Sequence, residues 1–374
     1  MSGVANNNSN DFVPPPPGEF LGHPKALWNL FGAEFWERFM YYGMRAMLAV
    51  HVAAAFFAHL GDGARAQASL TFGGYTSMVY MTGIAGGFVA DRILGYQRSI
   101  MLGGALMAAG MLMLMSPDLT SFLIGLSIIV VGNGLFKPNI STMVGKLYAP
   151  GDARRDSGFT IFYMGINLGA FFSPLICGGL GDTGSIGDFK YGFLAACVGM
   201  IISIISFELL KNKYLMGPDG NAIGMPVKTL DAKNLGIVIG SFVLIFFLLS
   251  FKNMFKSDVD LIGYLIYGAM IIVPLVIITD KSLTPEEKSR IAVIFILAFF
   301  VIFFWSAFEQ AGASLTIFAD SQTNRNIGSW TMPASWFQSV NPLGIIVLAP
   351  IFTYFWGMRS EEHTSELQSL RHIS

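Results

Sequence analysis

Long apolar stretches alternate with short polar segments along most of this chain. A helix needs about 20 apolar residues to cross the hydrocarbon core of a bilayer, which is about 30 Å thick. Ten stretches reach or approach that length, and we interpret each as a candidate membrane-spanning helix. They lie at about 26–58, 69–91, 98–116, 119–147, 158–180, 191–210, 234–251, 259–279, 291–319 and 335–358. The pattern predicts an all-α integral membrane protein.

The distribution of Lys and Arg between alternate loops predicts the orientation. Loops on the cytoplasmic side of membrane proteins are enriched in these residues. If the N-terminus is cytoplasmic, the inner segments carry 13 Lys and Arg and the outer segments carry 5. We therefore predict a cytoplasmic N-terminus, in a multi-pass protein of the bacterial inner membrane.

The two ends of the chain differ from the apolar pattern. Residues 1–25 contain an Asn-rich run and four consecutive prolines, without the basic and apolar regions of a signal peptide, and predict a disordered cytoplasmic tail. Residues 359–374 follow the last apolar run abruptly. They resemble the translation of a sequencing adapter, so we expect them to be non-native. A genuine polar cytoplasmic tail is the alternative.

Composition and motifs exclude several classes of function. The chain is 53% hydrophobic and 13% charged, whereas soluble domains average about 25% charged residues, so a soluble regulatory protein is excluded. No metal-ligand spacing, nucleophile elbow or phosphate-binding loop is present, and His51 and His59 have no candidate partners. The sequence therefore predicts neither an enzyme nor a metal site nor a nucleic-acid partner.

The first apolar stretch contains four charges that a membrane helix rarely tolerates. An ionisable group near the middle of a bilayer costs at least about 2.5–3.5 kcal/mol on insertion scales. Glu34, Glu37 and Arg38 are spaced i, i+3 and i+4, within pairing distance on one helix face. Arg45 lies nearly on the same stripe, about 10 Å further along the axis. A purely structural ion-paired cluster is one interpretation, and a functional site is the one we favour.

Two further charges lie deep in apolar stretches. Lys137 is too far from either end of its stretch to place its ammonium at the interface, and Pro138 follows it as a helix distortion. Glu309 shares a helical face with Trp305 and Gly312 by spacing. A carboxylate pair, two cations and a distant carboxylate facing one another suit a proton-coupled site for a zwitterion. Tyr80, Tyr163, Asn167 and Asn341 give weaker signals.

At these residues the chain resembles the proton-dependent oligopeptide transporter family, a branch of the major facilitator superfamily. Residues 34–42 match the family's first-helix motif E-x-x-E-R-F-x-Y-Y without a gap. The loop at 87–98 resembles the superfamily's gating loop, and 136–139, 162–169, 308–310 and 335–342 match further family motifs. The resemblance covers about residues 27–358.

The resemblance implies a role for each candidate residue. Proton coupling would involve Glu34, Glu37, Arg38, Lys137 and Glu309, with Lys137 as a switching ion-pair partner and Glu309 as part of the extracellular gate. The peptide would be bound by Arg45 and Lys137 at its C-terminus, by Tyr42, Tyr80, Tyr163, Asn167 and Asn341 along its backbone, and by Trp305 at a side chain. The gating loop would use Asp91, Arg92, Gly95 and Arg98.

The resemblance also implies an architecture. We expect a six-helix N-terminal bundle at 26–211, a cytoplasmic linker at 212–233, an inserted helical pair at 234–280 and the first two helices of a C-terminal bundle at 281–358. About ten membrane helices of an expected fourteen would then be present. We expect the chain as written to be unable to transport, because alternating access needs two bundles that rock against each other.

The function implied is import of di- and tripeptides by proton symport with alternating access. The proton would be the coupling ion, with no cofactor, and the protein would be a monomer whose partners are small peptides and the lipid bilayer. A related symporter for another small anion or zwitterion, such as nitrate or an amino acid derivative, is the alternative. An integral membrane enzyme or receptor would need a catalytic constellation near an interface, which the sequence lacks.

Overall fold

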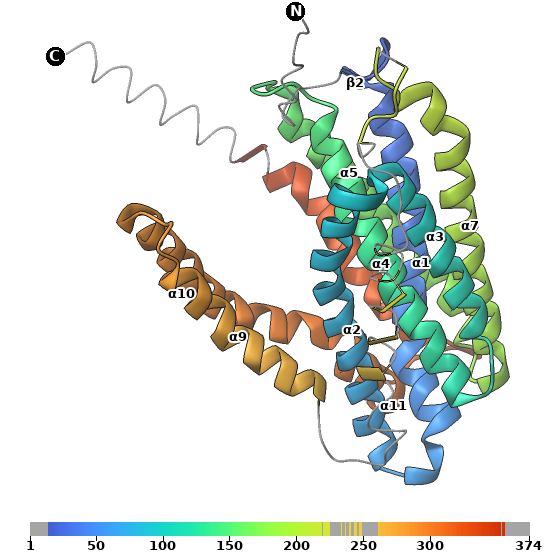
Figure 1. Ribbon diagram of the computed structural model, residues 1–374. Coiled ribbons are helices and arrows are strands. Elements are labelled where there is room, and N and C mark those ends of the chain that lie inside the picture. Colours follow the sequence, from blue (N-terminus) through green and yellow to red (C-terminus); the bar gives the residue numbers. More distant parts are fainter. Residues whose placement is uncertain are drawn as a thin grey trace, which may run out of the picture.

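The computed structural model describes residues 14–218, 220–224 and 261–352, with isolated helical positions between 233 and 248 and residues 354–355 (Figure 1). The α-helices are α1 (Lys25–Phe56), α2 (Gly63–Val89), α3 (Tyr96–Met113), α4 (Leu119–Lys146), α5 (Arg154–Ser173), α6 (Gly179–Gly181), α7 (Phe189–Tyr214), α9 (Leu261–Thr279), α10 (Pro285–Phe308) and α11 (Ser314–Gln322). The 3-10 turns are η1 (Ala58–Leu60), η4 (Ile186–Asp188), η5 (Glu309–Gly312) and η6 (Ala334–Ser339), and the π turns are η2 (Ala90–Leu94) and η3 (Pro174–Gly178). Two antiparallel hairpins pair β1 (Glu19–Phe20) with β2 (His23–Pro24) and β3 (Asn326–Ile327) with β4 (Trp330–Thr331).

The expected helical membrane fold is what the described residues form. Seven segments are long and apolar enough to cross a membrane: Lys25–Phe56, Leu119–Lys146, Arg154–Gly181, Ile186–Tyr214, Leu261–Thr279, Pro285–Gly312 and Ala334–Phe352. Helices α2 and α3 have 27 and 18 residues and pack in the same bundle, but they are less apolar. The first of the two inserted helices lies mostly, and the adapter-like tail wholly, outside the described residues. The predicted linker at 212–233 is described only at 212–218, 220–224 and 233.

Two sequence expectations differ from the structure. The predicted span at 291–319 corresponds to Pro285–Gly312 and does not continue to 319, because α10 gives way to η5 and the backbone then breaks at Ala313 (φ −120°, ψ −97°) before α11. Hydropathy did not reveal the break because apolar residues lie on both sides of it. Part of the predicted N-terminal tail is ordered, since residues 19–24 form the β1–β2 hairpin.

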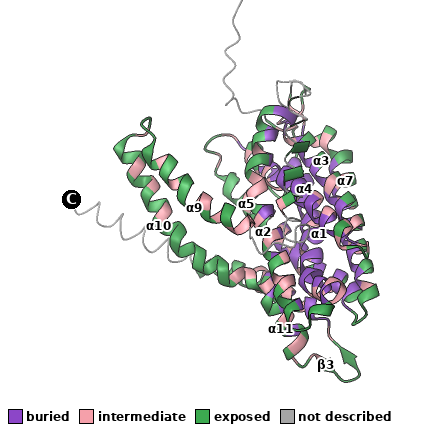
Figure 2. Ribbon diagram, turned by 60° about the horizontal axis from the view of Figure 1, so that its bottom comes forward, coloured by how far each residue is buried: buried purple, intermediate pink, exposed green. Residues whose placement is uncertain are grey.

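Helix α1 is the centre of the bundle and contacts α5, α7, α2 and α4 (Figure 1). Of its 32 residues, 20 are buried, so it contacts other helices around most of its circumference. Figure 2 shows that buried positions concentrate in this group of helices. The charged residues of α1 are therefore enclosed by protein.

Glycines let neighbouring helices approach this core closely. A β-carbon at Gly103 of α3 would lie 2.5 Å from the carbonyl oxygen of Gly132 in α4, and one at Gly132 would lie 2.6 Å from that of Gly103. Seven residues further along α3, Gly110 meets Gly125 in the same way, with distances of 2.7 and 2.9 Å. Contacts of this kind replace the hydrophobic effect, which does not drive helix association in lipid.

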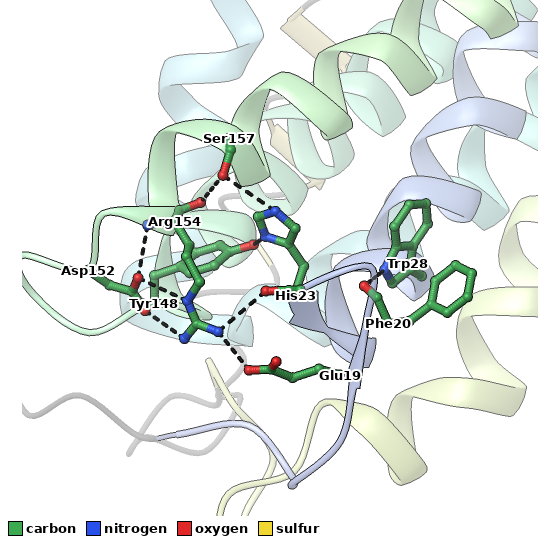
Figure 3. A network of polar contacts seen from close by, with 9 residues as sticks. Glu19, Phe20, His23, Trp28, Tyr148, Asp152, Arg154 and Ser157 are labelled. Carbon is green, nitrogen blue, oxygen red and sulfur yellow. Dashed lines mark hydrogen bonds and ion pairs between the residues drawn. The ribbon is translucent and has the colours of Figure 1, made fainter.

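The β1–β2 hairpin is held against the loop between α4 and α5 (Figure 3). Arg154 donates to the Glu19 carboxylate at 2.6 Å and pairs with Asp152 at 2.9 Å. The hydrogen bonds from Arg154 hold the pKa of the Asp152 carboxyl below its usual range. His23 Nδ1 lies 2.8 Å from the Tyr148 hydroxyl, and this contact is buried. The start of α1 is thus tied to the start of α5.

Helices α9 and α10 lie side by side and leave the bundle (Figures 1 and 2). No described residue of either helix is buried. Most of their described side chains are exposed, although Ile262 of α9 packs against the hydrophobic core.

We predict that Gly132→Ala lowers the thermal unfolding midpoint. Ala is better than Gly in a helix by about 0.8–1.0 kcal/mol, but the added carbon would meet the Gly103 carbonyl, and overpacking costs about 1–3 kcal/mol. Gly73→Ala in α2 is the matched control, because a β-carbon there meets nothing within 4 Å. Unfolding of the two detergent-solubilised variants measures the difference, and equal midpoints would refute the close approach of α3 and α4.

Candidate functional site

A buried cluster of three charges lies in the first half of α1. Arg38 Nε lies 3.1 Å from Glu34 Oε1 and 2.5 Å from Glu37 Oε2. All three side chains are at most 2% exposed. Two carboxylates share one guanidinium, so the cluster carries one net negative charge when both are ionised, and uptake of one proton would neutralise it.

The amide of Asn133 completes this cluster from α4. Its Nδ2 donates to Glu37 Oε1 at 3.1 Å. Glu34 Oε2 and Arg38 Nη2 are buried and have no hydrogen-bond partner among the described residues. An unpaired acceptor and an unpaired donor leave the cluster able to bind a proton, a water molecule or a ligand group.

A second charged pair joins α1 to η5. Arg45 Nη2 donates to Glu309 Oε2 at 2.6 Å, although 264 residues separate the two. The Tyr80 hydroxyl of α2 donates to the other oxygen of Glu309 at 3.1 Å. The contact is tight because Gly312 has no side chain: a β-carbon there would lie 2.8 Å from Arg45 Nε. Glu309 therefore holds together three segments that are far apart in the sequence.

Aromatic rings lie between the two charged groups. The Arg38 guanidinium lies 5.2 Å from the centre of the Tyr41 ring and 6.0 Å from that of Tyr42. The Arg45 guanidinium lies 5.9 Å from the centre of the Tyr42 ring and 5.5 Å from that of Phe72. Rings at this distance stabilise cations electrostatically. Tyr42 thus connects the two sites along one stripe of α1.

Lys137 of α4 faces the same region without an ion pair among the described residues. Its Nζ lies 5.3 Å from the centre of the Tyr80 ring. The charges that act on it most strongly are those of Arg38, Glu37 and Glu34, followed by that of Glu309. Lys137 is therefore a cation beside Tyr80, whose hydroxyl is bound to Glu309.

Helix α4 runs through Pro138 without interruption, where the sequence suggested a local opening. Because proline has no backbone N–H, the carbonyl of Gly134 lacks the hydrogen bond that residue 138 would otherwise donate within the helix. A β-carbon at Gly86 would clash with this carbonyl oxygen, so the backbone of α2 packs directly against it.

The remaining sequence-predicted residues are not joined to this group by the contacts of the described residues. Tyr163 and Trp305 are about half exposed, at 51% and 46%. Asn167 is buried, and its amide donates to the Tyr163 carbonyl in its own helix at 2.8 Å. Asn341 is exposed, beside the buried Pro342.

The loop between α2 and α3 is a π turn that ends at Gly95, whose φ is +76°. Asp91 accepts from the Tyr96 hydroxyl at 2.6 Å, and Arg92 lies over the Phe88 ring at 5.2 Å. Arg98 is exposed. The turn places Asp91 and Arg92 on the surface, at the same end of the helix bundle as the N-terminus.

Sequence reasoning missed three residues that matter here. Asn133 is a neutral amide inside a motif of glycines, and only its contact with Glu37 marks it. Phe72 carries no charge and no motif that marks it in the sequence, yet it lies against Arg45. Gln97 anchors the α2–α3 loop by donating to the carbonyls of Leu215 and Ile223 at 2.8 and 3.0 Å. Within the described ranges, no group of three or more His, Cys, Asp or Glu forms a candidate metal site.

Comparisons with known proteins agree on one family. The model of the POT family matches residues 97–374. The uncharacterized transporter YclF of Bacillus subtilis is 38% identical, over 91% of this chain and 69% of its own length. A di-/tripeptide transporter of Lactococcus lactis subsp. cremoris is 36% identical, over 93% of this chain and 72% of its own length.

Solved structures give the same result. A variant of a peptide transporter POT in complex with sulfate has a TM-score of 0.76 at 35% identity, covering 94% of this chain and 72% of that one. A POT family transporter in complex with 5-aminolevulinic acid has a TM-score of 0.76 at 33% identity, covering 91% and 72%. The predicted fold class, an all-α membrane protein of this type, is confirmed.

We predict that Arg38→Ala costs about 3–5 kcal/mol of stability, because it leaves two buried carboxylates without their cation. Thermal unfolding measures it. Arg290→Ala is the matched control: Arg290 pairs with Glu286 at the same i, i+4 spacing, but both are more than three quarters exposed, and we expect no change in the midpoint.

The neutral triple variant Glu34→Gln/Glu37→Gln/Arg38→Met separates charge from packing. We expect its midpoint to lie above that of Arg38→Ala, because no unpaired charge remains buried. A triple variant that unfolds below Arg38→Ala would show that the cluster stabilises the bundle through packing alone.

Proposed function

Since the chain belongs to the POT family, we propose that it imports di- and tripeptides by proton symport with alternating access. A di-/tripeptide transporter of Lactococcus lactis and a peptide transporter of Yersinia enterocolitica, 36% and 37% identical to this chain, support the substrate class. Its apolar helices make it a multi-pass membrane protein. The excess of Lys and Arg in alternate loops supports a cytoplasmic N-terminus in a bacterial inner membrane.

The observation that carries the proposal is the ion pair of Arg45 with Glu309. Arg45 is 5% exposed, and its Nε has no partner among the described residues. The C-terminal carboxylate of a peptide would compete with Glu309 for this guanidinium. A proton on Glu309 would release Arg45 for the peptide. Peptide binding and proton binding would then favour each other, as symport requires.

The first cluster and Lys137 provide the rest of the coupling apparatus in this proposal. One of the two carboxylates paired with Arg38, Glu34 or Glu37, would take up a proton, and Lys137 would switch its ion pairing when that happens. Its position beside Tyr80, whose hydroxyl is bound to Glu309, supports this role. Lys137 and Arg45 together would hold the peptide's C-terminus.

The polar and aromatic residues of the binding pocket follow from the same proposal. Tyr42, Tyr80, Tyr163, Asn167 and Asn341 would bind the peptide backbone, and Trp305 would contact a side chain. The exposure of Tyr80, Tyr163 and Trp305, at about half each, leaves them accessible to a ligand. Asp91, Arg92, Gly95 and Arg98 would form the inner gating loop.

We assign residues 26–211 to the first bundle of the carrier and 281–358 to the start of the second. The proposal needs no cofactor, and the proton is the coupling ion. We expect a monomer that catalyses no covalent chemistry. An amino acid derivative is a second candidate substrate, because a family structure 33% identical to this chain holds 5-aminolevulinic acid.

Uptake by the purified protein in liposomes tests the proposal. We expect accumulation of labelled dialanine when the outside is acidic, and loss of accumulation on adding a protonophore. Unlabelled di- and tripeptides should compete, whereas single amino acids and nitrate should not. If only 5-aminolevulinic acid competes, the substrate is an amino acid derivative and not a peptide. Uptake that is unaffected by the protonophore would exclude proton symport.

We predict that Glu309→Gln uncouples transport. Gln cannot gain or lose the proton, so pH-driven accumulation should fall while peptide exchange across the membrane continues. Linked binding sites typically couple by about 1–3 kcal/mol, which is a 5–150-fold effect, and we expect a loss in that range. Glu286→Gln is the control, because that carboxylate is 77% exposed in the first turn of α10. Unchanged accumulation in Glu309→Gln would remove Glu309 from the coupling.

A further inference from the structure

The segment η6 packs against the end of α5, η3 and α6, opposite the chain's N-terminus. Ser339 Oγ donates to the Phe171 carbonyl at 2.8 Å. A β-carbon at Gly178 would lie 2.9 Å from Cβ of Ser335, so η6 lies as close as a glycine allows. Side chains at this contact come from segments about 150 residues apart. We call this contact, η6 against residues 171–182, the outer contact.

A buried carboxylate holds the outer contact. Asp182 follows α6 directly and is 7% exposed. Its Oδ2 accepts the backbone N–H of Ser335 at 3.0 Å. Its own N–H donates to the Gly178 carbonyl at 2.8 Å, which fixes Asp182 to the end of η3. A backbone N–H near the start of η6 has no partner within its own helix, so this hydrogen bond satisfies it.

We propose that Asp182 is a proton-sensitive residue that stabilises the closed form of the carrier's outer end. This inference rests on the proposed function, because only an alternating-access carrier must open and close there. When the outer end opens, η6 leaves residues 171–182 and the carboxylate becomes hydrated. When it closes, the carboxylate is buried again.

The direction of the pH effect follows from burial. Burial raises the pKa of Asp182 above its usual value, and the hydrogen bond from Ser335 opposes this only in part. The closed form therefore binds a proton more readily than the open form. As the pH falls from neutral through the raised pKa toward the usual value of about 3.9, closure becomes more favourable. Well above the raised pKa this contribution is absent.

Two charged groups act on Asp182 from the elements packed beside it. Asp320 of α11 raises its pKa and Arg325 lowers it. The two form an ion pair at 2.8 Å, and Arg325 also donates to the Met332 carbonyl at 2.7 Å. Because their charges oppose each other, burial remains the dominant influence. In an importer this sign is useful: acid outside favours closure of the outer end around a loaded site.

Distance measurements between spin labels test the proposal. Ser185 and Ser329 are exposed on the two sides of the outer contact and can carry labels as cysteines, after Cys177→Ser and Cys197→Ser remove the native thiols. In lipid nanodiscs we expect the ratio of short to long distances to rise several-fold between about pH 8 and about pH 5. In Asp182→Asn the amide oxygen still accepts from Ser335 without a charge, so short distances should dominate at every pH.

Two further variants complete the test. Asp182→Ala removes the acceptor, so the fraction of molecules with long distances should increase and the pH dependence should disappear. Asp188→Asn is the control: Asp188 lies in the same loop and accepts from Thr183 at 2.7 Å, and the wild-type pH dependence should remain. A pH response in Asp182→Asn equal to the wild type would overturn the proposal, even if Asp182→Ala fails to fold. The readout needs no transport, so it is independent of the uptake experiments.

Discussion

The structure depends on one constraint: the charges of α1 lie inside an apolar bundle and must be compensated there. Glu34, Glu37 and Arg38 satisfy one another, and Asn133 supplies the remaining donor to Glu37. Arg45 has no such neighbour within its own helix. Its counter-charge comes from Glu309, 264 residues away, so the requirement for pairing brings η5 to α1.

Close helix packing makes this compensation possible. The Asn133 amide reaches Glu37 because α4 is held near the core by glycine contacts, among them Gly132 with α3 and Gly134 with α2. In the same way, Gly312 lets η5 approach Arg45. Residues that look like helix breakers in the sequence therefore set the distances over which the charged groups interact. The composition of 42 Gly among 374 residues reflects this use.

Periodicity and charge predict the side-chain contacts within one helix, but few of the contacts between helices. The i, i+4 spacing of Glu34 and Arg38 predicted their contact, and apolar length predicted most of the helices. The rule that a buried charge needs a partner predicted that Arg45 and Glu309 face a common site, but no spacing gives their contact. The break at Ala313 could not be predicted, because apolar residues continue through it. The role of Asn133 could not be predicted either, because its side chain carries no charge.

The outer contact and the charged site are connected by one side chain. Gln338 of η6 donates to Thr316 Oγ1 of α11 at 2.9 Å and lies 3.5 Å from the carbonyl of Ala46, the residue after Arg45. Asp182 holds the start of the same six-residue turn. If η6 moves away as a unit, it loses its contacts with Asp182 and with α1 together. A two-state element touched by both groups is the physical requirement for coupling between them. Movement of η6 would therefore link the protonation of Asp182 to the geometry around Arg45.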